Sequence, residues 1–195
     1  MQLAIHKEQT DEWEKRAVKV LSHFNWKHPD EIDLYDICWR YGVKIKPFES
    51  EFFDEEVSYE SVNHLNAFSI PKRIGRRGTI YLNPHLNALE KRLILAEEFC
   101  HCYAHYSSQL DMDHHYINKQ ENQAMRMAAY LLMPTKFLNR VYETAINEPV
   151  LISDIADYFL VTEEFAHFRL ELTFQHRVDG FSVLRDRLGS IEWFN

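Results

Sequence analysis

The chain has 195 residues, of which 46% are apolar, 14% aromatic and 27% charged, with a formal net charge of −8. This composition is typical of a globular protein, and neither a long apolar run nor an apolar N-terminal stretch indicates a membrane span or a signal peptide. We therefore expect a cytoplasmic protein without a membrane partner. The acidic balance argues against direct nucleic-acid binding, which draws on dense Lys and Arg.

The first third of the chain predicts two helices and a strand. Residues 8–24 are helical in pattern, and residues 33–42 form a second helix that Gly42 ends. The sequence "VKIKPF" at 43–48 predicts a short strand, and the acidic stretch 49–60 has no clear period and predicts a loop. Three cysteines without a framework spacing predict reduced structural thiols: Cys38, Cys100 and Cys102.

A hairpin and a long helix follow. Residues 66–83 have the form of two short strands around a basic connection, and "NALE" at 87–90 resembles a capping box that opens a helix running to about residue 105. The hairpin tip is either a solvated basic turn or a surface that steers an acidic partner. Its basic residues are Lys72, Arg73, Arg76 and Arg77.

The second half predicts helices only. A loop over 107–120 leads to a helix from about Glu121 to Met133, which Pro134 ends. A helix at about 135–146 and a helical pair within 152–173 complete the pattern. The fold class is therefore α+β and mainly helical. We expect a domain of residues 1–147 with residues 148–195 packed on it as a helical extension.

One face of the helix at 88–105 carries two carboxylates and two imidazoles. Glu97, His101 and His105 recur at i, i+4 and i+8, and Glu98 lies beside them. Residues four apart lie about 5–6 Å apart on a helix, which lets two side chains close on one metal ion. The alternative is that this face of an ordinary amphipathic helix is solvated.

Glu121 lies in the middle of the apolar face of the next helix, among Met125, Ala128 and Leu132. A carboxylate that points into a packed interface is costly unless it has a cationic partner, and a metal ion is one. The alternative is an acidic residue in the first turn, where it favours the helix dipole and reaches solvent. Taken together, the two helices predict one site formed by Glu97, His101 and Glu121.

The sequences "LAEEFCHCYAH" at 95–105 and "ENQAMRMAAYLLMP" at 121–134 resemble the paired motifs of the ImmA/IrrE family of metallopeptidases. That family joins Leu-Ala-His-Glu-Leu-Gly-His-x-x-x-His to Glu-x-x-Ala-Asn-x-Phe-Ala-Ala-x-Leu-Leu-Met-Pro. The resemblance extends over about residues 30–175. It implies a zincin-like fold, with a small twisted sheet or hairpin above the metal helix and a helical pair near the C-terminus.

By the same resemblance, Glu97, His101 and Glu121 are the metal ligands and Glu98 is the general base. Glu97 stands where the family pattern has His, although members reading Ala-Glu-Glu-x-x-His also occur. Two carboxylates and one imidazole give a dication a local net charge of about zero, which weakens it as a Lewis acid. The set suits one divalent metal, with Zn²⁺ expected first and Mn²⁺ or Fe²⁺ tolerated. The other departures are Cys100 for Gly and Met125 for Asn.

Three further histidines have candidate roles. His105 is either an ordinary surface residue, a group that supports a metal ligand, or an alternative ligand in place of Glu97. His114 and His115 lie in the expected loop, from which they either approach the site or remain solvated.

The resemblance implies a metal-dependent endopeptidase that cleaves a helix-turn-helix repressor, releasing a phage-like mobile element or a stress response. The substrate would add as a strand to the edge of the hairpin at 66–83. The altered residue Glu97 keeps open an alternative, a non-catalytic antirepressor that binds the repressor. A DNA-binding role for the pair within 152–173 is disfavoured, because its acidic residues outnumber Arg169.

Overall fold

The computed structural model describes residues 11–53, 59–72, 77–105, 114–174 and 191–192. The helices are α1 (Glu12–Leu21), α2 (Leu34–Tyr41), α3 (Tyr59–Val62), α4 (Ala88–Ala104), α5 (His114–Leu132), α6 (Thr135–Ala145), α7 (Ile152–Phe159) and α8 (Glu163–Phe174). The strands are β1 (Val43–Pro47), β2 (Ala67–Pro71), β3 (Gly78–Leu82), β4 (Val150–Leu151) and β5 (Ile191–Glu192). The predicted α+β, mainly helical class is confirmed.

The main sheet has the order β1-β3-β2, with β1 parallel and β2 antiparallel to β3. The predicted hairpin is thus confirmed, but β1 covers the outer side of β3, which is buried along its whole length. Among the described residues, no strand pairs with the other side of β2. Only β2 therefore offers the hairpin's edge for strand addition.

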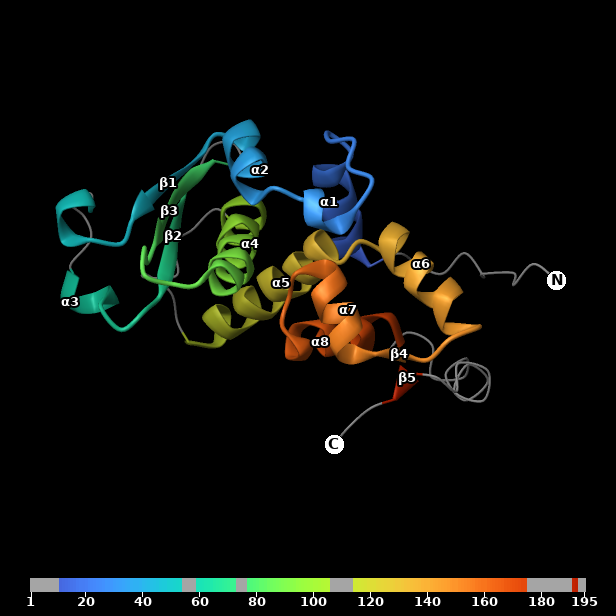
Figure 1. The fold of residues 1–195 in the computed structure, drawn as a ribbon. Helices are drawn as coiled ribbons and strands as arrows, with labels where there is room; N and C mark the ends of the chain where they lie inside the picture. The colour runs from blue at the N-terminus through green and yellow to red at the C-terminus, as the bar shows by residue number, and fades with distance from the viewer. Residues whose placement is uncertain (1–10, 54–58, 73–76, 106–113, 175–190, 193–195) are drawn as a thin grey trace.

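The two faces of this sheet differ. Helix α4 packs against β2 and β3 on one face, and the short α3 lies on the other (Figure 1). The stretch predicted as a loop contains a 3₁₀ turn at Ser50–Phe52 and the start of α3, and residues 54–58 lie outside the described residues. On that far face a second cluster of buried and half-buried side chains forms, comprising Phe48, Phe53, Val62, Leu65, Phe68, Ile70 and Tyr81.

Helix α4 begins as its sequence predicts. The Asn87 side chain accepts from the Glu90 backbone N–H at 2.9 Å, and the Glu90 carboxylate accepts from the Asn87 N–H at 2.9 Å. This capping box satisfies two backbone donors that the first helical turn leaves without partners. It fixes the start of the helix that carries the acidic and imidazole groups.

Helix α5 begins at His114, seven residues before the predicted start at Glu121. Residues 114–120 contain neither Gly nor Pro, so nothing in this stretch stops the helix from extending backwards. His114 and His115 therefore open a helix instead of lying in a loop. Glu121 lies about two turns inside α5, which rules out its interpretation as a first-turn residue.

Buried side chains of α1, α4, α5, α7 and α8 form one hydrophobic cluster. The C-terminal helical pair is thereby packed on the rest of the chain, and a short parallel pairing of β4 with β5, which the sequence did not predict, adds to it. The division into residues 1–147 and 148–195 stays a prediction.

All three cysteines are buried and free, as expected. No helix among the described residues has the length and apolarity to cross a membrane.

Candidate metal centre

Helices α4 and α5 bring Glu97, His101 and Glu121 together. One ligand atom from each lies within 4.8 Å of the other two, and His101 Nε2 is 3.6 Å from Glu121 Oε2. The His101 side chain is only 4% exposed. The alternative that this helix face is solvated is therefore wrong at His101, in the middle of the face. The Glu121 side chain is 44% exposed, more than its place on the helix predicts, and the cluster therefore opens to solvent on the α5 side.

The two carboxyl groups of the cluster repel each other. The pKa of Glu97 is raised to about 7, first by burial and then by the negative charge of Glu121, with which Glu97 also shares a hydrogen bond. Two carboxyls in such contact are satisfied by a shared proton or by a cation. A bound divalent ion would therefore offset the negative charge of the Glu97 carboxylate.

His101 is the only imidazole in the cluster. Burial alone would lower its pKa, but the hydrogen bond to Glu121 and the charges of Glu98, Glu121 and Glu97 outweigh burial and raise the pKa. The surroundings of His101 therefore favour a positive charge at this position. A bound cation would also be stabilised by the negative charges of Glu97, Glu98 and Glu121.

Glu98 follows Glu97 on α4 and is directed at the sheet. Burial raises the pKa of its carboxyl group, and a hydrogen bond from the Ser69 side chain on β2 acts in the opposite direction. Ser69 is a part of the site that sequence reasoning missed. No local signal marks it, because its contact with α4 depends on how the hairpin packs.

His105 caps the C-terminus of α4 and is 8% exposed. Its ring centroid lies 5.5 Å from that of His101 and 6.4 Å from that of Trp13. Among the described residues the cluster of ligand atoms comprises Glu97, His101 and Glu121 without His105. The structure therefore places His105 behind His101 rather than beside Glu97. Its Nε2 is buried and has no hydrogen-bond partner among the described residues.

At the base of the hairpin tip, the Lys72 N–H donates to the Arg77 carbonyl at 2.8 Å. Both residues are exposed, while Arg73 and Arg76 lie outside the described residues. The role of this basic turn in partner binding stays a prediction.

The donor set fits a divalent ion. Two carboxylate oxygens and one imidazole nitrogen converge from two helices, and a cation would offset the burial and the charge of Glu121 that together raise the pKa of Glu97. A small sheet beside a helix that carries acidic and imidazole groups, with a second helix supplying a carboxylate, is the arrangement of zincin-like proteins.

The family follows from a direct comparison. The model of the peptidase M78 family, described as the IrrE N-terminal-like domain, matches residues 40–171. The chain belongs to this family, and the resemblance drawn from its two motifs is confirmed. No curated protein and no solved structure is similar enough to the chain to be matched to it. Family and cluster together indicate a divalent metal.

Proposed function

We propose that the chain is a metal-dependent endopeptidase that cleaves a helix-turn-helix transcriptional repressor. Glu97, His101 and Glu121 would hold one divalent ion, Zn²⁺ first and Mn²⁺ or Fe²⁺ next. The convergence of these three side chains in a chain of the peptidase M78 family is the observation that carries the proposal.

The reaction assigns separate tasks to the protein groups. A bound divalent ion supplies Lewis acidity, which activates water and polarises a peptide carbonyl. The Glu98 carboxylate accepts the proton of the attacking water and later delivers it to the leaving amine. Its burial next to the cluster supports this role, because burial raises the pKa of the Glu98 carboxyl and so makes it a stronger base than an exposed carboxylate.

The edge of β2 is suited to orient an extended substrate. The Asn83 N–H donates to the Asn66 carbonyl at 2.9 Å, so in this antiparallel register the even-numbered β2 residues pair with β3. The peptide groups of Ala67 and Ser69 are therefore directed away from β3. An added strand would pair with these groups, close to Glu98.

The choice of a repressor as substrate rests on the family resemblance. An acidic segment of that partner would be steered by the basic turn formed by Lys72, Arg73, Arg76 and Arg77. Direct DNA binding by α7 and α8 gains no support, since Arg169 is 1% exposed and offers no charge to a phosphate. The exposed residues of that pair are mostly acidic: Asp154, Asp157, Glu163, Glu164 and Glu171.

The test is cleavage of the repressor encoded beside the gene, by purified protein loaded with Zn²⁺ or Mn²⁺. We expect discrete fragments, and a loss of about 10²- to 10⁴-fold in cleavage rate in Glu98→Gln, because general-base catalysis contributes about that much. Glu164→Gln, at an exposed position of α8, is the matched control and should cleave like the wild type. Equal rates for Glu98→Gln and the wild type would refute the assignment of the base.

A second candidate function is a repressor-binding protein that does not cut. The hydrogen bond between Glu97 and Glu121 favours it, because a shared proton satisfies this pair without a metal. In the same experiment, release of the repressor from its operator without any fragments, unaffected by Glu98→Gln, would support this function over cleavage.

A further inference from the structure

Ser69 connects the edge strand to the proposed general base. Along β2, Phe68 and Ile70 belong to the aromatic cluster on the far face of the sheet. Because side chains alternate along a strand, Ser69 lies on the opposite face, toward α4. There its side chain is hydrogen-bonded both to Glu98 and to Cys102, which lie one turn apart on α4.

The chemistry of the three groups sets the direction of this chain of hydrogen bonds. A thiol is a weak donor through its S–H and a weak acceptor through its sulfur. A hydroxyl has one proton and two acceptor lone pairs, so Ser69 can accept from the thiol and donate to the Glu98 carboxylate. The carboxylate only accepts. This arrangement gives each of the three groups a partner.

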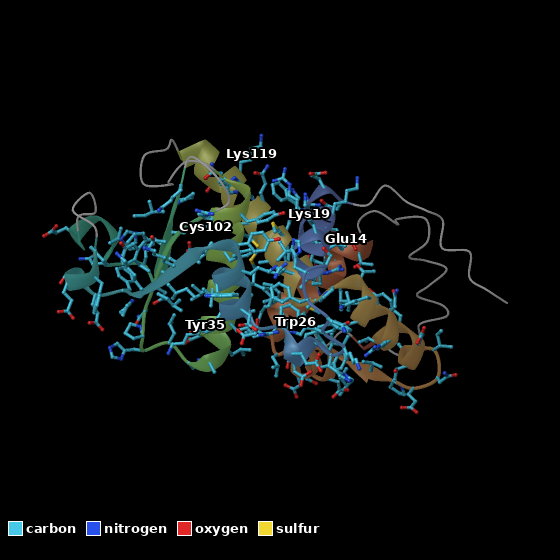
Figure 2. The ribbon with its side chains drawn as sticks, turned by 90° about the horizontal axis from the view of Figure 1, so that it is seen from above. Glu14, Lys19, Trp26, Tyr35, Cys102 and Lys119 are labelled. Carbon is cyan, nitrogen blue, oxygen red and sulfur yellow. The ribbon has the colours of Figure 1, made fainter. Side chains whose placement is uncertain are left out.

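Cys102 is itself held in place by β3. A Cβ atom at Gly78 would lie 2.5 Å from Cys102 Sγ and 2.7 Å from the Ile70 carbonyl oxygen. Only glycine at position 78 leaves room for the thiol, which lies where α4 meets the sheet (Figure 2). The thiol therefore has little freedom to move away from Ser69.

The peptide group of Ser69 lies in the plane of the sheet and is directed toward the open edge of β2, where an extended chain would pair. We infer that Ser69 is a positioning residue that orients the Glu98 carboxylate. This inference rests on the proposed function, because it assigns Glu98 the role of base. If Ser69 were only a structural residue of β2, its loss would act equally whether or not Glu98 is present.

Binding of acetohydroxamic acid to the Co²⁺-loaded protein tests the inference without relying on cleavage. The visible absorption of Co²⁺ reports the binding of both metal and ligand, and the N–OH group of the hydroxamate can donate to a nearby carboxylate such as that of Glu98. We expect Ser69→Ala to weaken acetohydroxamate on the order of tenfold, the usual effect of losing a hydrogen bond to a charged group. Ser69→Thr keeps the hydroxyl and should restore the affinity, while Co²⁺ affinity stays unchanged in both variants.

The decisive comparison repeats Ser69→Ala in a Glu98→Ala background. If Ser69 acts through Glu98, the second substitution adds no further loss. An equal loss in both backgrounds, or wild-type affinity in Ser69→Ala, would overturn the inference and leave the proposed function intact. A wild-type protein that binds no Co²⁺ would instead overturn the proposed function, and the inference with it.

Discussion

Two polar centres of this protein adjoin helix α5, and their charged groups are matched by partners to different degrees. At the C-terminal end of α5, Arg169 is 1% exposed and donates from Nε to the Met133 carbonyl and from Nη2 to Thr135 Oγ1, each at 3.0 Å. Its guanidinium also lies 4.4 Å from the centroid of the Tyr130 ring. The fold itself supplies the partners that this charge needs.

The cluster of Glu97, His101 and Glu121 holds two acidic groups and one imidazole, so its charges are not matched one to one. Two carboxyls face each other, and the pKa of Glu97 is raised to about 7. A buried charge whose partners come from the fold makes those partners depend on it, whereas crowded like charges indicate a ligand site.

The largest effect on stability is expected at Arg169. Arg169→Leu removes donors from a buried carbonyl and two hydroxyls, and we expect the free energy of unfolding to fall by about 2–4 kcal/mol. Denaturant unfolding measures it, with the exposed Arg140→Leu as the control. Metal bound per folded molecule should stay the same. If Arg169→Leu lowered the free energy of unfolding by less than Arg140→Leu does, Arg169 would not be a stabilising group.

An intermediate effect is expected at Glu97 in the metal-free protein. A carboxyl whose pKa rises from 4.5 to about 7 on folding binds more protons in the folded state within that interval. The free energy of unfolding therefore falls as pH rises from about 5 to 8, by roughly 1–3 kcal/mol relative to Glu97→Gln. Unfolding of both proteins with chelator present checks this. A difference that does not change with pH would show that folding does not raise the pKa of Glu97.

The smallest effect is expected at His105, and it has the opposite sign. Burial lowers the pKa of His105 from 6.5 to about 4, so the folded protein binds fewer protons in this interval. The contribution to stability is present above pH 6.5 and is lost as pH falls through this range. His105→Phe keeps a ring between His101 and Trp13 and should remove this loss. Thermal melts of both proteins at pH 4.5 and 7 would show no such difference if His105 titrates normally.

The local features of the fold could be predicted because their causes are local. The Asn87–Glu90 capping box, the Gly42 stop with a φ of 67° and the i, i+4 pair of Glu97 and His101 each depend on a few neighbouring residues. Glu121 was found because a carboxylate on an apolar face violates the helical pattern. The start of α5 was misplaced for a different reason, because no residue between 114 and 120 gives a start signal.

The features that could not be predicted depend on packing between distant segments. The burial of Arg169 requires the junction of α5 and α6, and counting Arg169 as a surface charge of the C-terminal pair was wrong. The contact of Ser69 with Glu98 requires the register of β2 and the approach of Cys102 to Gly78. No spacing in the sequence encodes these contacts. They decide how the candidate base is held.

Elemental analysis of protein purified without chelator is the sharpest test of whether side chains of α4 and α5 together bind one divalent ion. Elemental analysis should find about one equivalent in the wild type and in the exposed variant Glu171→Ala, and almost none in Glu121→Ala. Wild-type protein that stays metal-free even after incubation with Zn²⁺, Mn²⁺ or Fe²⁺, or Glu121→Ala that retains a full equivalent, would contradict such binding.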